Sequence, residues 1–289
     1  MGKGKGWASI GVARSNDGGR TWPRPVAQPG YENDAFEYGD GRYAGITLPG
    51  TPPSAAADNF YGDALPSAFV DEMDPSGSYY LYVPYQFSGA PGVKPDSSIH
   101  IARAKLGDRF GHHEEGPLHF TKWFNGKWSE KGRGGNESGV TPICQRSSGD
   151  GNGQISYNDA LHLYMMTFAC RTYACKSAGN CTPTELALYF TTATSLEAED
   201  WTQPQLIENS AYPVQVDAQG GQIVDGGYPT FVSPQCRPGH LGLSGKVLFL
   251  KGDVIGSRVF AARSFKISFS GSDDEKRVDN ACGPLPAPG

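Results

Sequence analysis

Three acidic side chains stand at matching places in a weak internal repeat of the chain. Asp63, Glu137 and Asp225 each lie three to five residues ahead of a repeated proline. Glycoside hydrolysis needs a carboxylic acid for the leaving oxygen and a second carboxylate as base or nucleophile, while a third can tune the pKa of the acid. These residue types therefore predict a glycosidase site, with Glu137 as the acid and Asp63 and Asp225 as base, nucleophile or pKa modulator.

Two observations weigh against that prediction. The chain has 30 Asp and Glu residues, and such residues before a strand commonly cap turns or face solvent. Asn136-Glu137-Ser138 is also an N-glycosylation sequon. A glycan on Asn136 would crowd a site at Glu137, so either the sequon is unused or the Glu137 side chain points elsewhere.

The repeat that positions these acids consists of short apolar segments. Three first segments share a proline, and each is followed by a second and a third strand rich in aromatic and aliphatic residues. The three units are Ala64–Val70, Tyr79–Tyr85 and Ile99–Arg103; Val140–Cys144, Leu161–Phe168 and Leu186–Phe190; Tyr228–Val232, Val247–Leu250 and Val259–Arg263. Two units close with a tryptophan-bearing segment, Trp123–Trp128 and Trp201–Pro204. Four short strands that repeat with weak similarity are typical of β-propeller blades.

The N-terminal region predicts the outer half of one more blade. Trp7–Arg14 and Trp22–Val26 are its expected third and fourth strands, and Ser15–Trp22 between them matches the pattern S-x-D-x-G-x-T-W. Asp17 can accept backbone N–H groups across the turn, and the glycines that follow it permit positive φ. This segment resembles the Asp box of sialidases and other BNR-repeat propellers, in which the box is structural.

The blades also resemble five-bladed glycoside hydrolases of the arabinanase and xylosidase type, and related propellers that act on D-arabinan. The similar phrases are Pro66–Val70 with Tyr79–Val83, and Thr191–Leu196 leading to Asp200–Gln205. The resemblance implies one carboxylate at or before the first strand of each of the first three blades. Two departures stand out: Ser67 replaces the acidic residue that follows the repeated proline, and the first-blade Asp of the family would lie upstream of Met1.

We therefore predict an all-β protein with a β-propeller that is five-bladed at full length, of which this chain holds about three and a half blades. Residues 1–270 form the propeller, which is incomplete at its N-terminus, and residues 271–289 form a polar tail held by a disulfide through Cys282. Blade topology places the loops 86–98 and 169–185 on the face that carries the acids. The third-strand arginines Arg14, Arg103 and Arg263 fall on the opposite face, which predicts a structural role and weakens a sialidase reading.

The composition limits the classes of partner that we expect. Only 19% of the residues are charged and the net charge is −5, so we expect neither nucleic acid nor membrane as a partner. Six cysteines without zinc-finger spacing, together with the sequons at Asn136 and Asn180, favour a secreted, disulfide-bonded glycoprotein. The first residues lack the apolar region of a signal peptide, which indicates a removed signal or a gene model that begins late. We expect a monomer without a cofactor, and the sequence leaves a structural metal ion in the central channel undecided.

The predicted function is a secreted glycoside hydrolase that acts on a polysaccharide such as an arabinan. The first alternative is a non-catalytic carbohydrate-binding propeller or a truncated, inactive enzyme. The second is a sialidase-like exo-glycosidase, which would need an arginine cluster and a Tyr–Glu pair that the repeats do not reveal.

Overall fold

The computed structural model describes a large part of the chain, with gaps. The described residues are 6–8, 10–11, 15, 17–21, 44–46, 60–72, 74, 76–87, 98–108, 118–132, 134–142, 153–177, 180–208, 215–216, 222–223, 225–252, 259–267 and 282. All regular structure within these residues is β-strand, which confirms the all-β prediction. The chain divides into two units: Met1–Pro66, Val70–Asp96 and His100–Val140 form the first, and Ser67–Phe69, Ser97–Ile99 and Thr141–Gly289 form the second.

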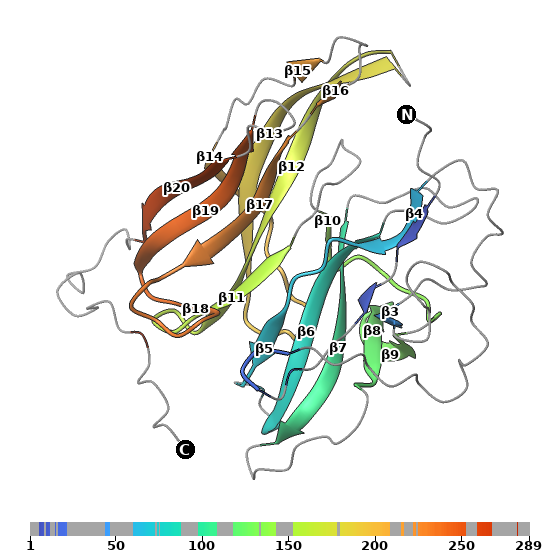
Figure 1. The fold of residues 1–289 in the computed structure, drawn as a ribbon, viewed down its shortest axis with the longest axis vertical. Coiled ribbons are helices and arrows are strands. Elements are labelled where there is room, and N and C mark those ends of the chain that lie inside the picture. The colour runs from blue at the N-terminus through green and yellow to red at the C-terminus, as the bar shows by residue number, and fades with distance from the viewer. Residues whose placement is uncertain are drawn as a thin grey trace. The chain divides into compact units, whose positions relative to one another are not determined.

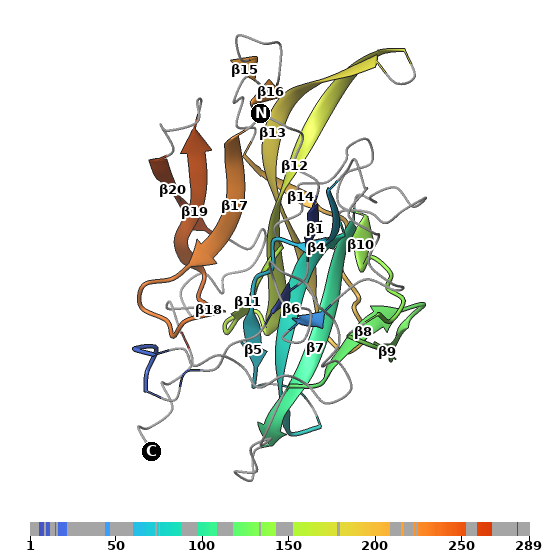
Figure 2. The ribbon, with the colours of Figure 1, turned by 45° about the vertical axis from the view of Figure 1, so that its right-hand side comes forward.

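The first unit is built on a sheet whose long central strands are drawn in cyan and green in Figures 1 and 2. The strands of its main path are, in spatial order, β1 (Gly6–Ala8), β4 (Phe60–Ala64), β6 (Ser78–Phe87), β7 (Ser98–Asp108), β8 (Phe120–Phe124) and β9 (Lys127–Lys131). β5 (Phe69–Asp71) pairs with β6, and the short strands β2 (Ile10–Gly11) and β3 (Ala44–Ile46) pair with each other. The strands from β6 to β9 follow one another in sequence and in space, as in an up-and-down meander.

Burial explains why the central strands read as nearly continuous apolar runs. In β7 the four residues from Ile99 to Ala102 are all buried, and in β6 burial runs from Tyr82 to Tyr85. Strands covered on both faces need apolar side chains on both. The core of this unit contains six buried residues: Ile10, Val83, Tyr85, Ala102, Ala104 and Phe120.

The second unit contains two larger sheets, drawn from yellow-green to red in Figure 1. One has the order β14 (Gln205–Glu208), β13 (Asn180–Ala193), β12 (Leu163–Ser177), β11 (Gln154–Asn158) and β18 (His240–Leu241); the other has the order β17 (Asp225–Val232), β19 (Ser244–Gly252) and β20 (Val259–Lys266). The short strands β15 (Gln215–Val216) and β16 (Gln222–Ile223) form a pair of their own. Both larger sheets contribute to one core, in which Met165 and Leu188 lie with Phe231 and Phe249.

The first strand of the second repeat differs from the prediction. We expected it at Val140–Cys144, but β10 covers only Thr141–Pro142 and pairs with Ser98 and Ile99 at the start of β7. The strand that pairs with β12 is β11, Gln154–Asn158. The sequence analysis did not predict this strand. The four residues Ile155–Asn158 are buried although two of them, a serine and an asparagine, are polar. The apolar pattern by which strands were predicted is therefore interrupted in this core strand.

The prediction of a loop at residues 169–185 is also wrong. β12 and β13 continue through it as a long antiparallel ladder in which Cys175 is paired with Cys181. The Thr and Tyr residues favour extended structure here, and the ladder runs as far as the pair of Ser177 and Asn180. At the N-terminus, the expected strand Trp7–Arg14 corresponds to β1 and β2, whereas Arg14 and Trp22–Val26 lie outside the described residues.

Candidate functional site

Glu137 lies in a buried polar cluster in the first unit. Its Oε2 accepts hydrogen bonds from the Tyr85 hydroxyl at 2.7 Å and from the Lys122 ammonium at 2.5 Å. His100 Nδ1 stands 3.9 Å from the other carboxylate oxygen, Oε1. The exposed fraction of the side chain is 6% for Glu137, 2% for His100 and 0% for Lys122. We call these four residues the Glu137 cluster.

Backbone hydrogen bonds hold the segment that carries Glu137 against β8 and β9. Gly132 N donates to Phe120 O at 2.7 Å, and Ser138 N donates to Trp123 O at 3.0 Å. Gly135 N donates to Lys131 O at 3.1 Å, and a Cβ at position 135 would stand 2.1 Å from that same oxygen. Glycine is thus required at 135, because the chain turns too tightly for a side chain.

The Lys122 ammonium can be buried because it is paired. Two charges removed from water cost several kcal/mol each, and only a close partner with further hydrogen bonds offsets that cost. Glu137 is that partner, and the Gly135 carbonyl lies a further 3.5 Å from Nζ.

The two oxygens of Glu137 have different surroundings. Oε2 takes both hydrogen bonds, whereas Oε1 is buried and has no hydrogen-bond partner. A buried carboxylate oxygen without a donor is rare, because it forfeits its hydration. Oε1 is thus a buried polar atom of the cluster whose hydrogen-bonding capacity is not used.

The other two predicted acids are placed only by their backbones. Asp63 lies in β4, in the same unit as Glu137, and its Cα partner is Phe87 in β6. Asp225 begins β17 in the second unit and is paired with Gly252. Their side chains lie outside the described atoms, so the convergence of three carboxylates stays a prediction.

Asn136 and Glu137 differ in their exposure to solvent. Asn136 is exposed, and its N–H donates to Glu130 Oε2 at 3.0 Å, whereas the Glu137 side chain is buried. A glycan on the exposed Asn136 is compatible with a buried Glu137 side chain, so use of the sequon does not by itself conflict with a role for Glu137.

Arg103 is held by aromatic packing. Its guanidinium lies 4.5 Å from the ring centroids of both Tyr80 and Trp128, and Nη1 donates to the Tyr82 hydroxyl at 3.2 Å. Such cation–π contacts occupy the faces of the guanidinium. This geometry is that of a packing residue, as the sequence predicted for the third-strand arginines.

The sequence analysis missed the partners of Glu137. Lys122 lies two residues after the buried Phe120 in β8, so alternation along the strand places this lysine on the buried face. A charged residue in phase with core residues is a signal that could have been read. Tyr85 and His100 lie among apolar neighbours and gave no such signal. The resulting Tyr85–Glu137 pair is one of the two elements that the sialidase alternative required.

Two other acidic side chains, Asp17 and Asp200, stabilise turns by accepting hydrogen bonds. In the Asp-box segment, Asp17 Oδ1 accepts from the backbone N–H groups of Arg20 and Thr21 at 3.0 and 2.8 Å, and Oδ2 accepts from Thr21 Oγ1 at 2.6 Å. The hydrogen bonds from Thr21 and Ser15 lower the pKa of Asp17 from 3.8 to about 2. Gly18 and Gly19 have φ of 71° and 85°, which confirms the predicted turn chemistry.

Asp200 plays a similar part between β13 and β14. It accepts from the backbone N–H groups of Thr194 and Ser195 at 3.0 and 3.1 Å, and from the Thr194 hydroxyl. Burial raises the pKa of Asp200, but these hydrogen bonds outweigh that effect and leave the pKa below its ordinary value. Both acids are therefore structural carboxylates.

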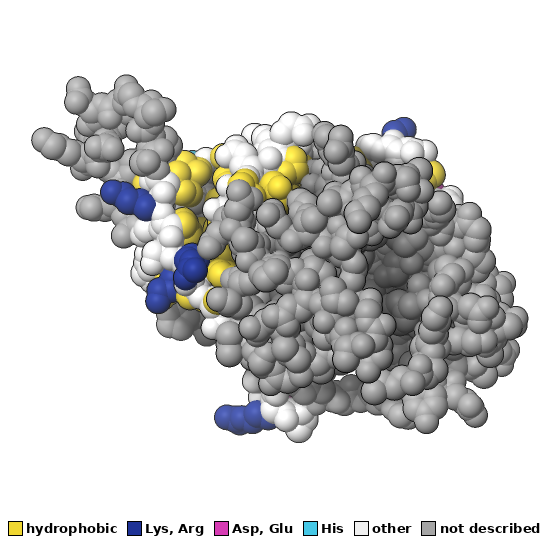
Figure 3. All heavy atoms as spheres, turned by 90° about the horizontal axis from the view of Figure 1, so that it is seen from above, with side chains coloured by type: hydrophobic (Ala, Val, Ile, Leu, Met, Phe, Trp, Pro, Cys, Tyr) yellow, Lys and Arg dark blue, Asp and Glu magenta, His cyan; other side chains and the backbone are white. Residues whose placement is uncertain are grey.

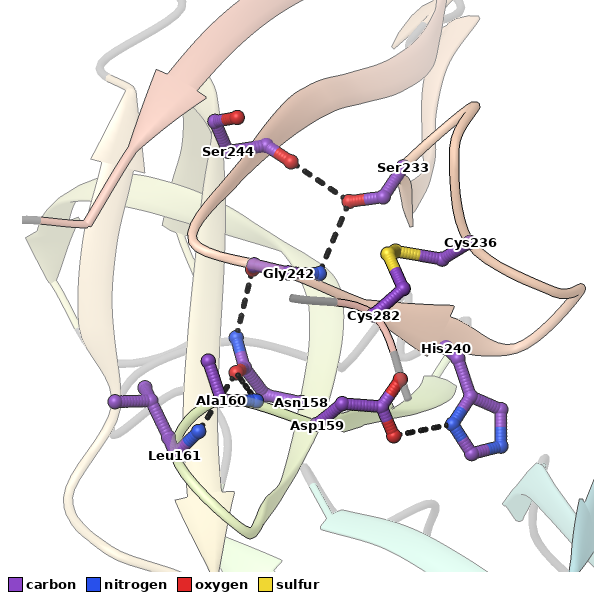
Figure 4. Close-up of a disulfide and its surroundings, with 10 residues drawn as sticks. All are labelled: Asn158, Asp159, Ala160, Leu161, Ser233, Cys236, His240, Gly242, Ser244 and Cys282. Atoms are coloured by element: carbon purple, nitrogen blue, oxygen red, sulfur yellow. Dashed lines mark hydrogen bonds and ion pairs between the residues drawn. A yellow bond between two sulfur atoms is a disulfide. The ribbon is translucent and has the colours of Figure 1, made fainter. Parts of the chain in front are cut away.

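A disulfide ties Cys282 to Cys236, with the two Cα atoms 5.2 Å apart, which confirms the predicted anchor of the tail (Figure 4). The loop that carries Cys236 is fastened to β11 and the turn after it. Asn158 Nδ2 donates to Gly242 O at 3.0 Å, and His240 Nδ1 lies 2.8 Å from Asp159 Oδ1. These contacts fix the chain that follows Cys236 to the end of β11.

The described surface offers few other features that bear on function. Phe260 is 87% exposed in β20, and hydrophobic and basic side chains both appear on the face drawn in Figure 3. Among the described residues no group of three His, Cys, Asp or Glu side chains could hold a metal ion. None of the described segments is a helix long and apolar enough to cross a membrane.

Comparison of the chain with known protein families, curated proteins and solved structures gives no match. Function must therefore be argued from the described residues themselves.

Proposed function

We propose that this chain is a secreted β-propeller domain that hydrolyses glycosidic bonds in a polysaccharide such as an arabinan. The observation that carries the proposal is the setting of Glu137. A residue selected by its repeat position turns out to be a buried carboxylate, anchored through one oxygen and without a hydrogen-bond donor on the other. A buried carboxylate beside a charged partner is a candidate for a functional group, and glycoside hydrolysis uses a pair of carboxylates.

The strand order supports the propeller part of the proposal. β6 to β9 in the first unit and β11 to β14 in the second are sets of four consecutive antiparallel strands. Such four-stranded meanders are the building unit of propeller blades. The Asp17 turn has the hydrogen bonds expected of an Asp box, which also belongs to propellers.

Product release from arabinans, xylans and sialosides tests the proposal, with the unmodified chain beside Glu137→Gln. We expect release from at least one substrate and a fall of about 10²–10⁴-fold in the variant. Glu199→Gln is the matched control, because Glu199 is also a buried glutamate that accepts a hydrogen bond, from Trp201 Nε1 at 2.5 Å. The Lys122→Met, Glu137→Gln double variant shows whether the loss follows the carboxylate or the fold.

A carbohydrate-binding propeller without catalysis is the second candidate. The observation that favours it is the Lys122–Glu137 pair, because a nearly enclosed ion pair can serve packing alone. In that case calorimetry would detect binding of an oligosaccharide without hydrolysis, and Glu137→Gln would change the affinity little. Release of sialic acid would instead favour the sialidase alternative, for which the Tyr85–Glu137 pair is the supporting contact.

A further inference from the structure

The pairing of the cysteines, which the sequence leaves open, can be completed from the strands that carry them. The chain has six cysteines, and the bond between Cys236 and Cys282 accounts for two of them. Cys170 in β12 is also disulfide-bonded. We infer that the partner of Cys170 is Cys144, so that this bond ties the segment between β10 and β11 to β12. The inference does not depend on the proposed hydrolase function.

The backbone register excludes the other two candidates, Cys175 and Cys181. Cys170 and Cys175 are five positions apart in β12, and Cys181 is the Cα partner of Cys175 across the ladder. Five residues of an extended strand span about 16 Å. The Cα atoms of a disulfide lie within about 7 Å of each other. Neither Cys175 nor Cys181 can therefore reach Cys170 in this sheet, and Cys144 remains.

The chain on both sides of Cys144 lies close to the face of β12 that carries Cys170. Before it, β10 pairs with the start of β7, which includes Ile99. After it, Gly153 lies so near that face that a Cβ there would stand 2.6 Å from Ile99 Cδ1 and 3.1 Å from Met166 Sδ. Met166 and Cys170 are four positions apart in β12, so alternation along the strand places their side chains on the same face. Cys144 itself lies outside the described residues, and these two ends of its segment belong to the same unit as β12.

The elimination leaves Cys175 and Cys181 as the remaining pair. They stand directly opposite each other in an antiparallel ladder, where Cα atoms are about 4.5–5.5 Å apart. That separation lies within the range found for disulfides, about 4.4–6.8 Å. All six cysteines belong to the second unit, and the bonds that follow are Cys144–Cys170, Cys175–Cys181 and Cys236–Cys282.

Each of these bonds forms by oxidation of two thiols. The two sulfur atoms become bonded, and their two protons and two electrons convert the disulfide of a thiol–disulfide oxidoreductase into its dithiol. Oxidants of this class act in the secretory compartments of cells. The pairing therefore requires synthesis in an oxidising compartment, as the predicted secretion of the chain would provide.

Peptide mapping without reduction tests the pairing. The chain is secreted from a eukaryotic host, free thiols are blocked with N-ethylmaleimide during denaturation, and N-glycans are removed. Trypsin then cleaves after Lys and Arg, except before Pro. One peptide, residues 177–246, holds both Cys181 and Cys236. The other four cysteines fall in separate peptides, which are residues 134–146, 147–171, 172–176 and 278–289.

The map has distinct outcomes. We expect the Cys144 peptide to be joined to the Cys170 peptide alone, and the peptide that holds Cys181 and Cys236 to be joined to both of the others. A link from the Cys170 peptide to any other peptide, or a blocked thiol at Cys144 or Cys170, would overturn the assignment. A blocked thiol at Cys175 would overturn the second bond. A chain that migrates as a covalent dimer before reduction would show that the bonds join two molecules, and the inference would be wrong.

A single substitution gives an independent check. Cys144→Ser should expose one thiol that reacts in denaturant, and the label should map to Cys170, whereas the unmodified chain should take up no label. Cys282→Ser is the matched control, because it frees Cys236 and should leave Cys170 bonded. If Cys170 stays unlabelled in Cys144→Ser, its partner is another residue and the inference fails. The map of the unmodified chain decides the question where a variant is not secreted.

Discussion

Asp17 and Glu137 are carboxylates of the same unit with opposite kinds of support. Asp17 is exposed and takes its hydrogen bonds from residues at most four positions away along the chain. Glu137 is buried, and its two donors, Lys122 and Tyr85, are 15 and 52 residues away. Both oxygens of Asp17 are bonded, whereas only one oxygen of Glu137 is. A carboxylate satisfied by its own turn depends only on local sequence, while one held from a distance depends on strands that folding brings together.

The largest expected loss of stability comes from removing Lys122, the ion-pair partner of Glu137. Lys122→Met leaves the Glu137 carboxylate buried without its cation, which should lower the free energy of unfolding by about 3–5 kcal/mol. Urea denaturation followed by tryptophan fluorescence measures the loss. Adding Glu137→Gln should recover a large part of it, because neither charge then remains. If the double variant is no more stable than the single one, the two side chains are not coupled.

The disulfide is a covalent contact between residues that are far apart in the sequence. Cys236 and Cys282 are 46 residues apart, and Cys282→Ser together with Cys236→Ser should cost about 2–4 kcal/mol, chiefly because the unfolded chain gains freedom. Thermal unfolding of the double variant beside the unmodified chain checks this. Full stability in the double variant would mean that the contacts around Asn158 and His240 hold the loop without the bond.

Asp200 extends the comparison between Asp17 and Glu137. It accepts hydrogen bonds from its own turn, as Asp17 does, but it is partly buried. Asp200→Ala removes the acceptor for Thr194 and Ser195, and exposure to solvent limits the expected loss to about 1 kcal/mol. Because the folded-state pKa of Asp200 lies below its ordinary value, its contribution is present above that value and is lost as the pH falls. The difference in stability between Asp200→Asn and the unmodified chain should therefore shrink in acid.

The smallest effect is expected at Asp17. Its pKa of about 2 in the folded chain lies below 3.8, so its contribution is complete above pH 3.8 and disappears as the pH falls toward 2. An NMR titration of its side-chain carboxyl resonance in the folded chain should give a midpoint near 2. A midpoint near 3.8 would show that the turn hydrogen bonds do not favour the carboxylate in solution.

Local patterns in the sequence were enough for the features that depend on neighbours along the chain. The Asp-box residues Ser15–Thr21 predicted a turn in which Asp17 accepts backbone N–H groups, and the aromatic runs predicted strands such as β6 and β19. Repeat position also selected Glu137 among 30 acids. Prediction failed at β11, because its serine and asparagine resemble loop residues, and at 169–185, because cysteines suggested a stapled loop where β12 and β13 continue.

Only the tertiary structure decided what surrounds Glu137. Its position was readable from the repeat, but the ammonium and hydroxyl on Oε2 come from strands that are brought together by folding. Those partners fix one oxygen of the carboxylate and leave the other without a hydrogen bond. The physical reason is that a carboxylate takes its properties from the dipoles and charges within a few ångströms, and in a sheet these are neighbours in space, which the order of residues along the chain does not reveal.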